Sequence, residues 1–298
     1  MRPPCGHNIG LAERVGYSVL FVCSLLPHAR ADESVGRSTA GGEPSAQSAA
    51  PTTPMSARAY WSGGRLRPFA AVVLDAGVSA RGRLMLGYGK PHWTWAGLEL
   101  DAMSTSDTAI TAVRARLALV VADIGLAYRR TWAYRRTWIE RERGYTEDDL
   151  KGRPRAAYHS LDLDVWGLIP AGSGFVQWEL ETVRLYGVPR GADVYEEWLR
   201  APVRPPWATA ARLAYAYTFG RGRATAGAMG EWLWLGGRGA LYRLGPLVSY
   251  AFTPHWEATL LLTTPVSSPD ELNFFTGLYG TVRVRWKFAS GERGSIFR

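Results

Sequence analysis

Apolar and polar side chains alternate along most of the chain after residue 65. In the clearest segment, Val282 and Val284 share one face with Trp286, while Arg283 and Arg285 share the other. Because successive side chains of a strand point to opposite faces, this period of two predicts β-strands with one apolar and one polar face. The twelve strands that we expect cover residues 68–78, 82–89, 92–103, 109–121, 123–134, 157–169, 174–187, 208–219, 224–235, 241–252, 255–264 and 275–288.

The lengths of these strands and of their connections point to a membrane. Soluble strands are typically about 5 or 6 residues long, whereas about 9 to 11 tilted residues cross a bilayer, and most of the predicted strands reach that length. The longest connections, residues 135–156, 188–207 and 265–274, all follow odd-numbered strands, and the other side has only short turns. This pattern predicts an all-β fold, a single antiparallel transmembrane β-barrel with short periplasmic turns and longer external loops.

The first 31 residues are typical of a secretory signal peptide. Arg2 and Arg14 precede an apolar run from Val15 to Leu26, and Ala29-Arg30-Ala31 offers a cleavage site. The apolar run is too short for a transmembrane helix, and a lipoprotein signal ending at Cys23 is a weaker alternative. We expect cleavage after residue 31, a disordered Ser/Pro/Gly leader over residues 32–64, the barrel over residues 65–288 and a tail over residues 289–298.

Composition and charge remove several classes of protein from consideration. Both cysteines, Cys5 and Cys23, lie in the predicted signal peptide, so neither a disulfide nor a cysteine-ligated metal is expected in the exported protein. The net charge of +9 comes almost entirely from arginine. Because the alternation places many of these arginines on the inward face of a barrel, nucleic acid is not an expected partner, whereas outer-membrane lipid is.

Taken together, these features resemble the bacterial outer-membrane β-barrel superfamily, in its porin-like form, over residues 65–288. Members usually end in an aromatic residue that closes the last strand, and Trp286-Lys287-Phe288 fits that role, with Phe297 as an alternative. The resemblance implies the outer membrane of a Gram-negative bacterium. The arginine bias suggests a high-GC genome such as that of a myxobacterium, whose gliding-motility machinery uses porin-like barrels.

The polar faces of the predicted strands supply the candidate lumen residues. They are Arg114, Arg116, Asp162, Asp164, Glu179, Glu181, Arg212, Glu231, Arg243, Glu257, Arg283, Arg285 and Lys287. Along the sequence these charges fall into blocks of one sign, with two basic and two acidic strands. Two interpretations stay open: opposed blocks impose a field across a narrow aqueous passage, or the charges pair and plug a small lumen.

The two long loops carry the candidate contacts with other proteins. In the second loop, Tyr195, Trp198 and Leu199 have helical spacing and are expected to form a short lid or a contact patch for another envelope protein. In the first loop, the acidic run Glu147-Asp148-Asp149 lacks the spacing of a calcium loop. We interpret that run as a solvated surface segment.

Neither a catalytic nor a cofactor site is expected. His159 and Ser160 are neighbours on a strand and therefore point to opposite faces, so the serine cannot pass its proton to that imidazole. The sequence has neither a phosphate-binding loop nor metal-ligand spacing. The expected function is a non-enzymatic porin-like barrel with a narrow charge-lined or plugged lumen. The alternatives are a structural component of an envelope complex, as in gliding motility, and a soluble secreted carbohydrate-binding β-protein.

Overall fold

A computed structural model describes residues 57–134, 138–142, 144–146, 148–150, 156–220, 222–271 and 279–292. The predicted signal peptide, the leader up to residue 56 and Phe297 lie outside these residues. Among the described residues, no helix is both long and apolar enough to span a membrane.

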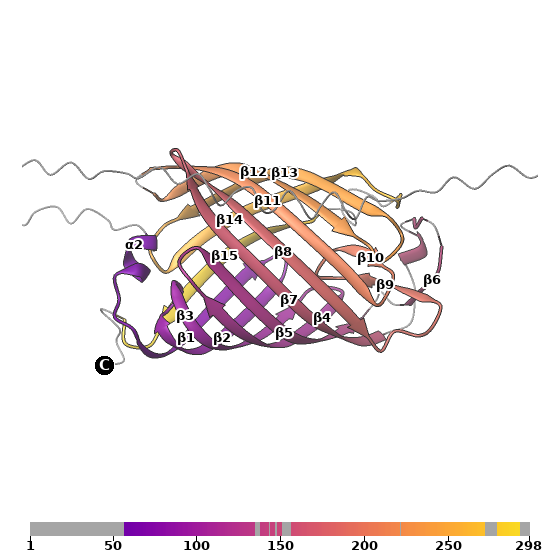
Figure 1. The fold of residues 1–298 in the computed structure, drawn as a ribbon, viewed down its shortest axis with the longest axis horizontal. Coiled ribbons are helices and arrows are strands. Elements are labelled where there is room, and N and C mark those ends of the chain that lie inside the picture. The colour runs from indigo at the N-terminus through magenta and orange to yellow at the C-terminus, as the bar shows by residue number, and fades with distance from the viewer. Residues whose placement is uncertain are drawn as a thin grey trace, which may run out of the picture. The chain divides into compact units, whose positions relative to one another are not determined.

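Twelve strands form one closed antiparallel barrel, which confirms the predicted fold (Figure 1). Each strand pairs with its neighbour along the chain, and the first strand pairs with the last. The barrel strands are β1 (Arg67–Gly77), β2 (Ala80–Lys90), β3 (Thr94–Ser104), β4 (Thr108–Ala118), β5 (Ala122–Ala133), β7 (Ala156–Ala171), β8 (Gly174–Tyr186), β11 (Trp207–Phe219), β12 (Ala224–Trp234), β13 (Ala240–Ala251), β14 (Trp256–Ser267) and β15 (Tyr279–Ala289). All twelve predicted segments correspond to these strands.

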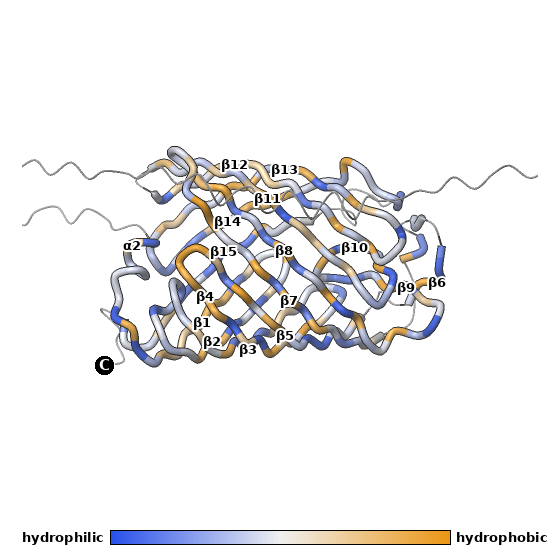
Figure 2. The backbone as a smooth tube through the Cα atoms, in the orientation of Figure 1, coloured by the Kyte–Doolittle hydropathy of each residue, from blue (hydrophilic) through white to orange (hydrophobic). Residues whose placement is uncertain are grey.

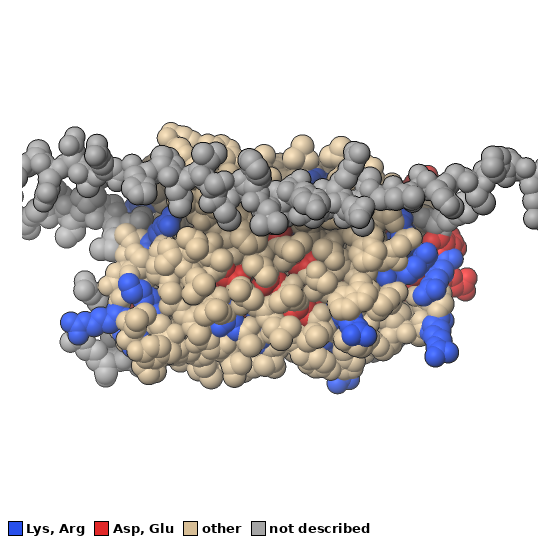
Figure 3. Space-filling model, in the orientation of Figure 1, with Lys and Arg blue, Asp and Glu red and all other residues tan. Residues whose placement is uncertain are grey.

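The barrel has an apolar exterior and a charged interior. On β5, Leu126 and Tyr128 are exposed, whereas Ala127 and Arg129 between and beside them are buried. Figure 2 shows the same alternation along most strands, and Figure 3 shows basic side chains gathered toward the two ends of a mostly uncharged band. A continuous belt of exposed leucine and valine is untenable in water but suits a bilayer. The belt argues against the water-soluble alternative.

The connections sort by length, as the sequence predicts. One end of the barrel, the turn end, holds the short connections 91–93, 119–121, 172–173, 220–223 and 252–255. The opposite end, the loop end, holds the three longest connections, at residues 134–155, 187–206 and 268–278, beside the short connections 78–79, 105–107 and 235–239. The first residue of β1 and the last residue of β15 both lie at the turn end, so the chain enters and leaves the barrel there.

The long loops contain ordered structure of their own. Strands β6 (Trp138–Glu140), β9 (Ala192–Glu196) and β10 (Ala201–Val203) form a three-stranded sheet in the order β10-β9-β6. A 3-10 helix, η1 (Asp148–Leu150), follows β6. We call the sheet together with turn residues 197–200 the cap.

The predicted leader and tail both differ from expectation at their borders with the barrel. Residues 57–62, placed in a disordered leader, form the helix α2 (Ala57–Ser62), because its Trp61 finds a buried apolar site against the barrel. Strand β15 runs one residue past Phe288 to Ala289, which pairs with Ala71 of β1. The strand therefore ends at the Trp286-Lys287-Phe288 segment.

Candidate functional site

The inner wall of the barrel carries ion pairs between neighbouring strands. Asp75 of β1 lies between two basic strands, 2.6 Å from Arg285 of β15 and 3.2 Å from Arg83 of β2. Glu99 of β3 is 2.7 Å from Arg116 of β4. Going around this part of the barrel, the sign of the inward charge therefore alternates from strand to strand.

A second group of pairs lines the opposite wall. Arg212 of β11 is bound by three carboxylates, with Glu231 of β12 at 2.6 Å and Glu179 and Glu181 of β8 at 2.8 and 3.0 Å. Arg243 of β13 is 2.7 Å from the other oxygen of Glu231. Glu231 thereby bridges the two arginines, with one carboxylate oxygen on each.

The structure places every lumen candidate on the inward face. Arg114 lies near Glu99 and Asp164, Asp162 pairs with Arg129, and Lys287 pairs with Glu257. The predicted separation into opposed blocks is corrected, because each basic block is flanked by acidic side chains of the adjacent strands.

Several inward charges were missed by sequence reasoning. These are Asp75, Arg81, Arg83, Glu99, Asp101, Asp123 and Arg129. A signal was available, since each occupies a polar position in the same period-two pattern.

The cap reaches from the loop end into the lumen. Its buried Leu199 belongs to an apolar cluster with the inward faces of β7, β8, β11, β12 and β13. Arg243 donates hydrogen bonds to the carbonyl oxygens of Leu199, at 2.9 Å, and Arg200, at 2.6 Å. Glu196 forms an ion pair with Arg129, at 3.1 Å. The cap is therefore bound to the barrel wall by both apolar packing and buried charges.

The expected contact patch of Tyr195, Trp198 and Leu199 requires correction. The segment is a strand followed by a turn, not a helix, and both Tyr195 and Leu199 are buried. The Trp198 ring lies 4.7 Å from the guanidinium carbon of Arg81 and 5.6 Å from that of Arg129. Apolar packing against the inner wall and cation–π contact draw these side chains inward.

Two buried carboxylates, Asp193 and Asp270, hold the outer part of the cap through separate contacts. Asp193 is 3.0 Å from Arg204 and accepts a hydrogen bond from the Tyr145 hydroxyl at 2.8 Å. Burial, together with that bond, raises the pKa of Tyr145 to about 12. Arg238 pairs with Asp270, whose carboxyl pKa is raised by burial.

At the turn end of the lumen, helix α2 packs against the inner wall through an aromatic side chain. Trp61 of α2 is buried against inward side chains of β1, β2 and β3, among them Phe69, Met85 and Trp95. Its ring also lies 4.5 Å from that of His92, and its Nε1 donates to the carbonyl oxygen of Pro254 at 3.1 Å. We call α2 and this apolar cluster the seal.

The histidine beside the seal is held neutral. His92 lies in the β2–β3 turn, and its Nε2 is 3.1 Å from the carbonyl oxygen of Phe288. Burial lowers the pKa of His92 from 6.5 to about 3. A proton on this ring is therefore strongly disfavoured while α2 is docked.

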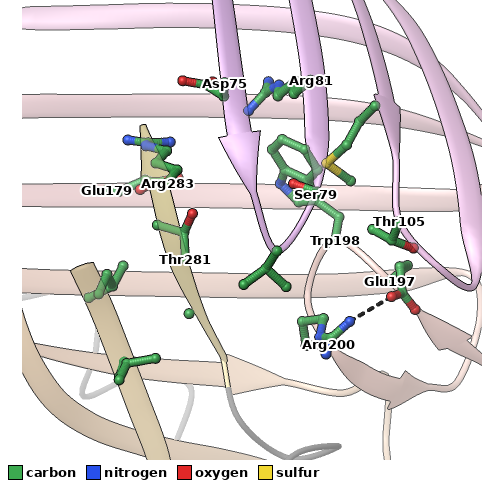
Figure 4. Close-up of a pocket in the computed structure, with 15 residues that line it drawn as sticks. Asp75, Ser79, Arg81, Thr105, Glu179, Glu197, Trp198, Arg200, Thr281 and Arg283 are labelled. Atoms are coloured by element: carbon green, nitrogen blue, oxygen red, sulfur yellow. Dashed lines mark hydrogen bonds and ion pairs between the residues drawn. The ribbon is translucent and has the colours of Figure 1, made fainter. Parts of the chain in front are cut away.

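Between the cap and the seal, one side of the lumen holds a cavity of about 340 Å³ (Figure 4). It reaches the β1–β2 and β3–β4 turns at the loop end, through Val78, Ser79 and Thr105. Its deeper wall includes Trp198 of the cap and Arg283 of β15. We call this cavity the vestibule.

The described residues give no arrangement for nucleophilic catalysis around His159. Its Nδ1 is 2.6 Å from the Tyr128 hydroxyl on the outer face, whereas Ser160 is buried inside and accepts a hydrogen bond from Arg129 at 3.0 Å. The two side chains therefore point to opposite sides of the wall. Within the same residues, no cluster of metal-ligating side chains occurs.

No protein-family model matches the chain, and no curated protein matches it either. Among solved structures, the chain is similar to the KdgM porin, with 10% identity, a TM-score of 0.37, and coverage of 74% of this chain and 97% of that one. It is also similar to the outer-membrane protein Omp33 of Acinetobacter baumannii, with 8% identity, a TM-score of 0.35, and coverage of 76% and 99%. The translocator domain of the autotransporter NalP from Neisseria meningitidis has 14% identity, a TM-score of 0.39, and coverage of 76% and 88%.

Proposed function

We propose that the protein is a non-enzymatic, porin-like barrel of the outer membrane that admits small solutes at its loop end and is closed at its turn end by the seal. The observation that carries this proposal is the vestibule. It is a space of about 340 Å³ inside a closed barrel, and charged and hydroxyl side chains line it. A barrel with a purely structural role gains nothing from such a space.

The outer membrane is the location that best suits the chain. Its exterior is a belt of exposed apolar side chains over a closed antiparallel barrel. Closed barrels of this kind satisfy every backbone hydrogen bond within the sheet, so they can cross a bilayer. The signal peptide predicted for residues 1–31 supplies the route of export, and its cleavage remains a prediction.

The seal is the element whose movement opens a passage. Helix α2 is only six residues long and touches the barrel chiefly through Trp61. Lys90 adds one hydrogen bond, from its Nζ to the carbonyl oxygen of Ser62 at 2.7 Å. No ion pair joins α2 to the described part of the barrel. The strands themselves keep their pairing when α2 leaves.

Conductance measurements in planar bilayers test this proposal. We expect small, stable current steps from the full-length barrel and larger or more frequent steps from Trp61→Ala, which removes the centre of the seal. Trp234→Ala is the matched control, because Trp234 is an exposed, outward tryptophan of β12. It should conduct as the unchanged protein does. No current from either the unchanged protein or Trp61→Ala, with both folded and heat-modifiable, would contradict a passage.

A structural role in a multi-protein envelope complex is the second candidate. It is favoured by the cap, which fills much of the loop end with packed apolar side chains. Silence in the bilayer combined with specific capture of an envelope protein would support it. A link with gliding motility stays a prediction from the sequence.

A further inference from the structure

One inward arginine differs from all its neighbours. Arg283 of β15 has no carboxylate within ion-pair distance among the described residues, whereas Arg81, Arg83, Arg285 and Lys287 each have one. Its Nε is buried and lacks a hydrogen-bond partner. Arg283 is only partly buried, but a cation inside the barrel without a carboxylate partner is still costly, so its retention at this position calls for an explanation.

The sheet register explains why Arg283 is unpaired. Its lateral neighbours are Gly77 on β1 and Thr259 on β14, and neither carries a charge. Glycine at position 77 also leaves no side chain beside the guanidinium. The nearest acidic side chains on the same strands, Asp75 and Glu257, lie one inward position away and bind Arg285 and Lys287.

The guanidinium lies on the wall of the vestibule (Figure 4). Thr281, on the same inward face of β15, lines the same cavity, as does Ser79 of the β1–β2 turn. Arg81 of β2 contributes a second guanidinium. Hydroxyl groups next to an arginine are the donors that bind carboxylate and phosphate oxygens in proteins.

The acidic side chains that line the vestibule are already engaged. Asp75 binds Arg285 and Arg83, and Glu197 is 2.6 Å from Arg200. Glu179 is 2.8 Å from Arg212. The charge left available to a solute in this cavity is therefore positive, although the wall as a whole is nearly balanced.

We propose that the vestibule binds a small organic oxyanion, a carboxylate or phosphate, through Arg283 with Thr281 beside it. The volume of about 340 Å³ suits a single small molecule, since a water molecule occupies roughly 30 Å³ in the liquid. As the entry site for a transported solute, this proposal rests on the proposed function. As a binding site, it stands on the geometry of the vestibule alone.

Binding of inorganic phosphate to the purified full-length barrel tests the site without any need for conduction. In a detergent that contains no phosphate, we expect the ³¹P resonance of free phosphate to broaden in the presence of the barrel. Arg283→Gln should weaken binding by about tenfold or more, the loss of one charge-assisted contact. Arg283→Lys should restore part of it, because the charge is kept.

The matched control is Arg184→Gln. Arg184 is an exposed arginine of β8 that stacks on Tyr186 and Trp207, outside the lumen, so the same loss of charge should leave phosphate binding unchanged. Equal broadening by the unchanged protein and Arg283→Gln, or no broadening by the unchanged protein, would overturn the site.

Reversal potentials in a salt gradient then separate this proposal from the proposed function. If the barrel conducts, Arg283→Gln should shift selectivity away from anions while Arg184→Gln does not. An unshifted reversal potential would overturn Arg283 as part of the passage. If the barrel is silent but phosphate binds through Arg283, the passage fails and the binding site stands.

Discussion

The two closures of the lumen are built from different chemistry. At the loop end, the cap is fixed by buried charge, with Arg243 bridging Glu231 to the carbonyl oxygens of Leu199 and Arg200. At the turn end, the seal is fixed chiefly by the apolar contacts of Trp61, with one hydrogen bond from its Nε1 to Pro254 and one from Lys90 to Ser62, and without any ion pair among the described residues. The cap fills one side of the lumen and leaves the vestibule on the other.

This difference separates a permanent part of the fold from a removable one. Withdrawing the cap breaks the ion pair between Glu196 and Arg129 and the two hydrogen bonds that Arg243 donates to cap carbonyl groups. Leaving a buried charge without its partner costs several kcal/mol. Withdrawing α2 exposes one tryptophan and a few apolar side chains of the barrel. The seal is therefore the closure that a modest change in conditions can release.

The largest effect is expected from Arg243→Ala. This change removes a fully buried guanidinium that binds Glu231 and two cap carbonyl groups, so the free energy of unfolding should fall by about 3 to 5 kcal/mol. Urea unfolding of the folded barrel in lipid vesicles measures this loss. Arg283→Gln, at an unpaired arginine, should shift the urea midpoint much less. Equal shifts for the two variants would contradict the difference between the cap and the vestibule wall.

An intermediate effect is expected from acid at the seal. The pKa of His92 is lowered to about 3 in the docked state, from 6.5 when the ring is free. Docking is therefore most stable above about pH 6.5 and weakens progressively as pH falls from 6.5 toward 3, because the released ring binds a proton more readily. Proteolytic release of α2, followed across this pH range, measures the effect.

His92→Gln provides the control for that measurement. Glutamine can still donate to the carbonyl oxygen of Phe288 but does not titrate, so the pH dependence between 6.5 and 3 should flatten. Glu292, whose carboxyl pKa is raised by burial, accounts for what remains. Identical pH profiles for the unchanged protein and the variant would remove His92 as the titrating group.

The smallest effect is expected from Arg204→Gln at the outer edge of the cap. Arg204 is partly exposed, and its partner Asp193 keeps the hydrogen bond from Tyr145 and a contact with Arg238 at 3.6 Å. The loss should stay below about 1 kcal/mol, as for exposed ion pairs in general. A loss as large as that of Arg243→Ala would show that the outer cap is as tightly coupled to the barrel as its inner turn.

The barrel was predictable from the sequence because the alternation of apolar and polar side chains is visible within the residues of each single strand. A strand such as β15 shows its two faces in its own residues, with valines on one side and arginines on the other. Helix α2 was not predictable in this way. It has no turn-to-turn apolar repeat, and its Trp61 is buried by side chains from β1, β2 and β3 that only the closed barrel brings together.

The sequence predicts which charged side chains face the lumen, but it does not predict which of them form ion pairs with each other. Alternation places Arg116 and Glu231 on the inward face, yet the partner of each depends on strand register, which no single segment contains. Around the barrel, the basic strands β4 and β15 lie between acidic neighbours, whereas the acidic strands β7 and β8 pair with each other and place Asp164 opposite Glu181. The unpaired state of Arg283 is likewise a property of register, since it follows from Gly77 and Thr259 lying beside it.

The ion pair between Asp75 and Arg285 joins residues from the two ends of the barrel sequence, and it bears on how the barrel closes during assembly. In the native register Asp75 lies opposite Arg285, and a slip of two residues either way would bring it opposite Arg283 or Lys287. An error of two residues in the pairing of β1 with β15 therefore still places a cation opposite Asp75. An error of one residue would instead turn the cations to the outer face of the barrel. Because Lys287 is already bound to Glu257 of β14, the register that would place it opposite Asp75 offers the weaker attraction.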